Sequence, residues 1–130
     1  WNYRETSIPF DEVVLECEVA TTEGSEQEIR RAMQKSQERR RITQPLGLPS
    51  CGSVFRNPEG ESVGRLIENV GLKGALCGGA QISERHANFI VNKGGAKAVE
   101  VLSLIHAASD AVAERYGVEL VPEVRFLGFE

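Results

Sequence analysis

The chain has 130 residues, of which 41% are hydrophobic and 26% are charged. This length corresponds to about one domain, and the apolar fraction is sufficient for a single globular core. Fifteen Lys and Arg against 19 Asp and Glu give a net charge of −4, which argues against a general nucleic-acid binder, and no apolar run reaches the roughly 20 residues of a membrane span.

The first predicted element is a strand over residues 13–20. Apolar side chains alternate with others along it, and this period of two is typical of an antiparallel or edge strand. One face of the segment consists of Val13, Leu15, Cys17 and Val19. On this interpretation Cys17 is a small core residue.

A helix is predicted from Ser25 to about Arg41. Ser25 and Glu28 form a capping-box pattern at its start, and its apolar positions are sparse, so we expect an exposed helix that connects two packed units. A basic stretch on this helix is opposed only by Glu38: Arg30, Arg31, Lys35, Arg39, Arg40 and Arg41. It is either a solvated helix face or a local site for an anionic ligand such as a phosphate.

Residues 44–60 are rich in Pro and Gly, which predicts a long ordered loop of the kind that often has a function. A short amphipathic helix is predicted over 62–70 and should end at Gly71. The next segment, 72–82, is glycine-rich, and no regular element is predicted there.

The last third of the chain predicts a short apolar strand over 87–91 and a helix over 97–116 that Gly117 ends. A final strand is predicted over 118–129. Helices and strands in this order, without an internal repeat, indicate an α+β or α/β fold.

The cysteines and histidines argue against several kinds of site. Three cysteines without a C-x-x-C pair fit a reducing cytosol, and neither a disulfide scaffold nor a zinc site. His86 and His106 have no ligand-type partner at helical spacing, so no metal site is expected. The sequence around Ser53 lacks the second glycine of a hydrolase nucleophile elbow, and the paired glycines do not form a dinucleotide-binding fingerprint.

Four longer motifs are more specific. They are Pro49 to Pro58 (PSCGSVFRNP), Gly64 to Gly74 (GRLIENVGLKG), Ala75 to Asn92 (ALCGGAQISERHANFIVN) and Pro122 to Phe126 (PEVRF). In this order they resemble the motifs of the UDP-N-acetylenolpyruvoylglucosamine reductase family, also called UDP-N-acetylmuramate dehydrogenases. The resemblance implies a bacterial cytoplasmic flavoenzyme of peptidoglycan synthesis. Such an enzyme uses FAD, with NADPH as the reductant, to reduce UDP-N-acetylglucosamine enolpyruvate to UDP-N-acetylmuramate.

The resemblance also implies a division of the chain. Residues 1–22 correspond to the end of the FAD-binding domain, 23–45 to a connecting helix and 46–130 to the C-terminal substrate-binding domain. That domain is expected to be α+β, with helices packed on a small sheet. Most of the FAD-binding domain is missing, so the chain is expected to be inactive alone, because no side chain can transfer hydride.

Three catalytic residues follow from the resemblance. Ser53 is the implied proton donor, and Arg4 and Glu123 are expected to bind the substrate carboxylate and its developing charge. The implied substrate-binding residues are Tyr3, Asn57, Arg40, Arg41, His86 and Asn88. For His86 and Asn88, a structural hydrogen-bonding role is the open alternative. The rival function is a stand-alone module that binds a UDP-sugar or a protein without redox chemistry.

Overall fold

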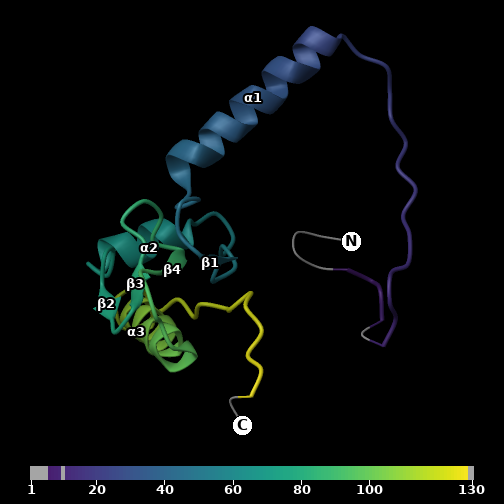
Figure 1. Ribbon diagram of the computed structural model, residues 1–130. Helices are drawn as coiled ribbons and strands as arrows, with labels where there is room; N and C mark the ends of the chain where they lie inside the picture. Colours follow the sequence, from purple (N-terminus) through teal and green to yellow (C-terminus); the bar gives the residue numbers. More distant parts are fainter. Residues whose placement is uncertain (1–5, 10, 129–130) are drawn as a thin grey trace. The chain divides into compact units, whose positions relative to one another are not determined.

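The computed structural model describes residues 6–9 and 11–128, which contain three helices and four strands (Figure 1). The predicted α+β class is confirmed. The chain divides into two units, residues 1–37 and 38–130, and the described core belongs to the second. Within the described ranges, no helix combines the length and the apolar character needed to cross a membrane.

The prediction of a strand over 13–20 is wrong. These residues belong to no strand or helix, and Val13, Leu15 and Val19 are 80%, 91% and 77% exposed. A strand needs a neighbour to bind its backbone N–H and C=O groups, and no described segment pairs with this one. Cys17 is exposed as well, so it is not a core residue here.

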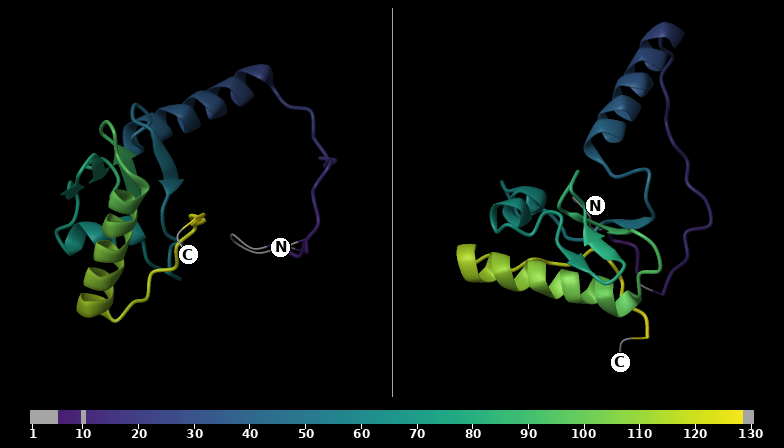
Figure 2. Two further views of the ribbon diagram at one scale, coloured as in Figure 1. Left: turned by 60° about the horizontal axis from the view of Figure 1, so that its bottom comes forward. Right: turned by 60° about the vertical axis from the view of Figure 1, so that its left-hand side comes forward.

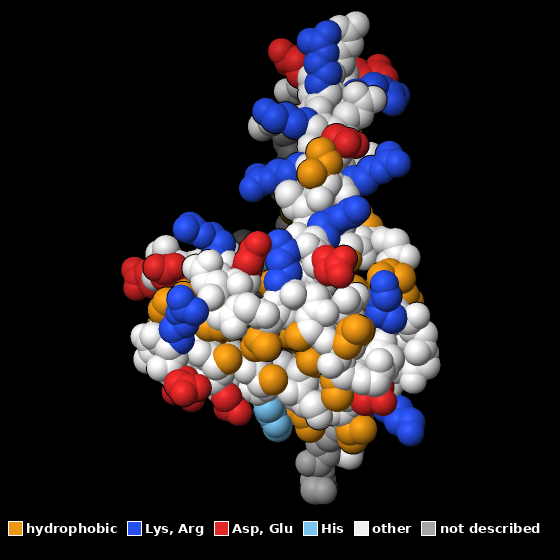
Figure 3. Space-filling model, turned by 90° about the vertical axis from the view of Figure 1, so that its left-hand side faces the viewer, with side chains coloured by type: hydrophobic (Ala, Val, Ile, Leu, Met, Phe, Trp, Pro, Cys, Tyr) orange, Lys and Arg blue, Asp and Glu red, His pale blue; other side chains and the backbone are white. Residues whose placement is uncertain are grey.

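The first helix is α1 (Glu26–Thr43), which confirms the predicted helix after Ser25. None of its residues is buried, as the sparse apolar pattern indicated. Glu26 binds Arg30 at 2.8 Å across one turn, and both side chains are exposed. Figure 3 shows Lys and Arg side chains on both sides of this helix, interspersed with acidic ones. An exposed ion pair such as that of Glu26 and Arg30 contributes little to stability.

The four strands form one antiparallel sheet in the order β1-β4-β3-β2. The strands are β1 (Ser50–Ser53), β2 (Leu76–Cys77), β3 (Ala80–Ile82) and β4 (Phe89–Asn92). All of β3 is buried, and β4 is buried except at its last residue. The central strands are therefore covered, whereas β1 and β2 form the edges.

Strand β1 lies inside the segment that was predicted to be a loop, and the prediction was wrong at that point. Its pairing with β4 is irregular: Ser50 faces Val91, Ser53 faces Phe89, and the register shifts between them. Gly52 has a φ of +84°, a left-handed conformation that side chains with a Cβ rarely adopt. The bend at Gly52 therefore sets the direction in which the chain enters Ser53.

Two helices complete the second unit, α2 (Val63–Asn69) and α3 (Ala98–Tyr116), and both were predicted. Helix α3 packs against β2, β3 and α2 (Figure 2). The largest fully buried side chains of the core are Phe55, Ile67, Ile82, Val54, Val63, Val91 and Val112. They come from both helices, from β3 and β4, and from the chain after β1, so one core joins all of these elements.

The predicted final strand is also wrong. After α3 the chain is largely irregular, and its only β pairing among the described residues is a single bridge between Pro122 and Phe55. Proline has no N–H to donate to a ladder, which limits regular pairing at this point. Two backbone bonds flank the bridge, Arg56 N to Val121 O at 2.9 Å and Glu123 N to Val54 O at 2.7 Å.

The glycine-rich segment contains β2, β3 and the turn between them, none of which was predicted. This turn lies against the start of α3, where Glu100 Oε2 accepts hydrogen bonds from Lys97 N at 2.9 Å and Gly79 N at 3.0 Å. These two N–H groups lower the pKa of the Glu100 carboxyl. The Glu100 side chain thus caps the N-terminus of α3 and holds the turn between β2 and β3 against it.

We expect Gly79→Ala to destabilise the chain. A Cβ at this position would lie 2.5 Å from the carbonyl oxygen of Gly94 and 2.6 Å from Ala96 N, and these backbone atoms cannot rotate away. Overpacking of this kind costs about 1–3 kcal/mol. Gly47→Ala is the matched control, because nothing lies within 4 Å of its Cβ. Urea unfolding of both variants checks this, and equal midpoints would contradict it.

Candidate functional site

Two of the three predicted catalytic residues lie on chain segments whose backbones pair with each other. Ser53 ends β1, and the backbone N–H of Glu123 donates to the carbonyl oxygen of Val54 at 2.7 Å. Glu123 therefore lies beside Val54, the residue that follows Ser53, although Ser53 and Glu123 are 70 positions apart in the sequence. The Glu123 side chain is partly buried, with its Oε1 atom shielded from solvent. A hydroxyl and a carboxyl group are thus contributed by adjacent backbone segments.

The third predicted catalytic residue, Arg4, and the predicted substrate-binding residue Tyr3 lie outside the described residues. Their roles stay predictions. In the described part of the chain, no three His, Cys, Asp or Glu side chains cluster in a way that could hold a metal ion.

Asn88 binds the chain segment that follows Ser53. Its side-chain Oδ1 accepts from Phe55 N at 2.9 Å, and its Nδ2 donates to Phe55 O at 2.8 Å. Its backbone oxygen accepts from Val54 N at 2.9 Å. The residue is 3% exposed. The amide that was predicted to contact substrate is therefore buried and bonded to the chain that follows Ser53.

His86 packs within the same loop. Its Nδ1 atom accepts from Asn88 N at 3.2 Å, and its ring lies edge-on to Phe89 with 5.1 Å between centroids. Burial lowers the pKa of His86, and the positive charge of Lys73 lowers it further. Because an imidazolium Nδ1 carries a proton and cannot accept, the hydrogen bond to Asn88 requires neutral His86.

The lowered pKa of His86 predicts a loss of stability in acid. The folded chain binds this proton more weakly than the unfolded chain, so the contribution is present above a pH of about 6.5 and is lost as the pH falls below it. Between pH 7.5 and 5.5, the free energy of unfolding should fall more in the wild type than in His86→Gln. Urea titrations at both pH values check this, and an equal fall would contradict it.

Asn57 is exposed and lies at the entrance to helix α2. Its Oδ1 accepts from Val63 N at 3.1 Å, while Ser62, the formal N-cap residue, makes no side-chain capping bond. The Asn57 oxygen therefore supplies the cap that satisfies one of the free N–H groups at this helix end. Asn57 as a whole is exposed, so it lies on the surface of the loop that follows Ser53.

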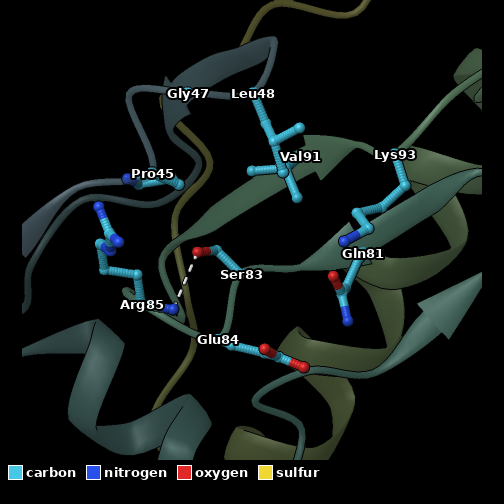
Figure 4. Close-up of a pocket in the computed structure, with 9 residues that line it drawn as sticks. All are labelled: Pro45, Gly47, Leu48, Gln81, Ser83, Glu84, Arg85, Val91 and Lys93. Atoms are coloured by element: carbon cyan, nitrogen blue, oxygen red, sulfur yellow. Dashed lines mark hydrogen bonds between the residues drawn. The ribbon is translucent and has the colours of Figure 1, made fainter.

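A pocket of about 420 Å³ lies where the chain after α1 meets the sheet (Figure 4). Its lining residues are Pro45, Gly47, Leu48, Gln81, Ser83, Glu84, Arg85, Val91 and Lys93. Figure 4 shows the side chains of Arg85 and Lys93 on opposite sides of it. The lining holds two cations, one carboxylate (Glu84) and the amide and hydroxyl groups of Gln81 and Ser83, a set with one net positive charge that suits an anionic ligand.

Arg85 also connects this pocket to the basic end of α1. Its guanidinium nitrogen NH1 donates to Arg41 O at 2.9 Å and to Gln44 O at 3.4 Å. Free carbonyls at a helix C-terminus favour such a cation. The backbone of Arg41, in the last turn of α1, is therefore bonded to a residue that lines the pocket, and the ligand-binding roles of Arg40 and Arg41 stay predictions.

Sequence reasoning did not single out Arg85, Lys93 or Gln81 as site residues. Arg85 and Gln81 belong to the Ala75–Asn92 motif, and Lys93 follows it directly. The motif therefore pointed to this segment but did not indicate what these three residues do. Their convergence depends on the pairing of β3 with β4, in which Gln81 faces Val91. Neither β3 nor that pairing was predicted.

Comparison with known proteins identifies the family of the chain. Residues 44–127 match the model of the UDP-N-acetylenolpyruvoylglucosamine reductase C-terminal domain. The chain belongs to this family. That membership supports the predicted reductase fragment and not the stand-alone binding module.

Individual relatives are similar over almost the whole chain. The UDP-N-acetylenolpyruvoylglucosamine reductases of Halalkalibacterium halodurans and Alkalilimnicola ehrlichii are each 48% identical, over 91% and 97% of this chain. The crystal structure of the reductase from Thermus caldophilus is 42% identical and matches 79% of this chain with a TM-score of 0.61. The chain spans 39% and 42% of the lengths of the two relatives and 36% of the crystallised protein.

Proposed function

We propose that this chain provides the substrate side of a reductase that converts UDP-N-acetylglucosamine enolpyruvate to UDP-N-acetylmuramate in peptidoglycan synthesis. The observation that supports this most directly is the hydrogen bond between Glu123 N and Val54 O, which holds Glu123 beside Ser53. Family membership gives the reaction class, and this juxtaposition gives the residues a shared place to act.

The roles follow from the charge that develops on the substrate. Hydride addition to the enolpyruvyl double bond builds negative charge next to the substrate carboxylate. Ser53 donates a proton to the resulting carbanion, which is basic enough to accept one from a hydroxyl group held within hydrogen-bond reach. Glu123 holds the carboxyl end of the substrate by a hydrogen bond, and Arg4 stabilises the developing charge there.

FAD, reduced by NADPH, would supply the hydride when bound. We propose that the part of the relatives that this chain does not span binds the flavin. Residues 13–20 support this, because their exposed apolar side chains alternate as in a strand that completes a sheet with other strands. We accordingly assign residues 1–22 to the end of the FAD-binding domain, 23–45 to a connecting helix and 46–130 to the substrate-binding domain of a cytoplasmic enzyme.

The pocket lined by Arg85 and Lys93 is our proposed site for the UDP part of the substrate. A diphosphate carries two negative charges, which Arg85 and Lys93 can bind from either side. Arg40 and Arg41 are proposed to add to this site, because Arg85 is bonded to the backbone of Arg41. Asn57 is proposed to contact the substrate with its exposed amide. We therefore apply the anionic-ligand interpretation of the basic stretch to Arg40 and Arg41, in the last turn of α1.

The test is expression of a full-length chain that contains these 130 residues. We expect a yellow protein with flavin absorbance that oxidises NADPH only when the enolpyruvyl substrate is added. Lys93→Ala should raise the KM for that substrate with little change in kcat, since it removes a binding contact away from the reacting atoms. A full-length protein that binds flavin and ignores this substrate would overturn the proposal.

A further inference from the structure

Asn88 is the most buried polar side chain near the candidate catalytic pair, at 3% exposed. We propose that it is a positioning residue that sets the placement of Ser53 relative to Glu123, and not a substrate contact. The inference rests on the proposed function, because it concerns the geometry of the same two residues. It assigns a task to the asparagine of the HANF sequence, residues 86–89.

The pairing of β1 with β4 is irregular near Ser53. It ends where Ser53 faces Phe89, and the register is already shifted before that point. Two residues after Ser53, Phe55 N and Phe55 O bind the Asn88 side chain at 2.9 Å and 2.8 Å. The bridge between Phe55 and Pro122 is flanked by bonds of Val54 and Arg56 and does not use Phe55 N and O, so the Asn88 amide binds the two backbone groups that this pairing leaves over.

Asparagine is suited to this task by its chemistry. Its short, planar amide presents an acceptor and a donor side by side, which match the N–H and C=O of a single residue. Leucine would fill the space and leave Phe55 N and Phe55 O without these bonds, which is costly for buried groups. An aspartate would keep the acceptor and lose the donor while it is ionised.

Val54 connects this pair of bonds to Glu123. Val54 donates to the backbone oxygen of Asn88 on one side and accepts from Glu123 N on the other, at 2.9 Å and 2.7 Å. The peptide that follows Ser53 is thus fixed between Asn88 and Glu123. If the Asn88 bonds are lost, this peptide can shift, and both candidate catalytic residues are attached to it.

The test uses Asn88→Asp in the full-length reductase. Ionised, the variant lacks the donor to Phe55 O; protonated, its carboxyl group offers the same donor and acceptor as the amide. At pH 8 we expect kcat to fall about 100-fold, as for a displacement of about 1 Å at a catalytic group. The KM for the enolpyruvyl substrate should change by less than about 3-fold, because no substrate contact is removed. At pH 5.5 the ratio of variant to wild-type kcat should recover at least about 5-fold, since burial favours the neutral carboxyl.

Asn92→Asp is the matched control. Its Oδ1 only accepts, from Gly94 N at 2.8 Å and Ala96 N at 3.1 Å, so a carboxylate can replace it without loss. Its kcat ratio should be near 1 at both pH values. Unfolding of Asn88→Asp at pH 8 with refolding at pH 5.5 would support the same assignment.

Three results would overturn the inference: an Asn88→Asp kcat equal to the wild type at pH 8, a raised KM with unchanged kcat, or a variant that is unfolded at both pH values. Failure of the proposed function would look different. In that case the wild-type full-length protein would itself not turn over the enolpyruvyl substrate, whatever stands at position 88.

Discussion

Replacing Ser53 by Ala should lower kcat of the full-length reductase by about 10²–10⁴-fold, the range typical of a lost general acid. The hydroxyl group is small and lies at the end of β1, so its removal should leave the fold intact. Substrate-dependent NADPH oxidation measures the loss. Binding of the enolpyruvyl substrate should be nearly unchanged, because the hydroxyl acts on charge that develops only in the transition state.

Ser62→Ala is the control for this prediction. Ser62 stands at the start of α2 without a side-chain capping bond, so its hydroxyl has no comparable task. The control should retain wild-type turnover and stability. Full turnover by Ser53→Ala would instead require another proton donor, and the role assigned to Ser53 would then be wrong.

The helices of this chain could be predicted from sequence because their signals are local. Gly117 ends α3 with a φ of +65° and donates to Ala113 O at 2.8 Å, as expected for a C-terminal glycine. Gly71 follows α2 with a φ of +79° in the same role. Apolar periodicity and an ending glycine are both properties of a few neighbouring residues, so they need no knowledge of the rest of the fold.

The strands were predicted poorly, since a strand depends on its partner. Strands β2 and β3 have two and three residues, too few to show a period of two, and they form because they pair with each other and with β4. The segment 13–20 shows the reverse case, with a clear alternation but no partner among the described residues. Local pattern is therefore neither necessary nor sufficient for a strand here.

The candidate site could likewise be predicted only in part from the sequence. The motif around Ser53 and the PEVRF motif identified two residues, but only the fold shows that their backbones meet. The contacts of the Asn88 side chain could not be read from its motif, because they depend on how the chain after Ser53 lies against the loop before β4. Residue types were predictable, whereas convergence and the division of labour were not.

The largest loss of stability is expected for Phe55→Ala. The side chain is 2% exposed and is the largest of the fully buried ones, so truncation removes apolar contacts and leaves a cavity. Such substitutions cost about 3–5 kcal/mol. Urea unfolding of the 130-residue chain measures this, and Phe55→Leu, which keeps most of the apolar volume, should lose less.

Position matters here as much as volume. The backbone of Phe55 binds the Asn88 amide and pairs with Pro122, so the ring anchors to the core the same short segment on which Ser53 and Glu123 depend. Leu127→Ala removes a side chain that is 86% exposed and should change the free energy of unfolding by less than about 0.5 kcal/mol. If Phe55→Ala lost no more stability than Leu127→Ala, the core would not extend to the site. The placement of the two proposed catalytic residues would then need another explanation.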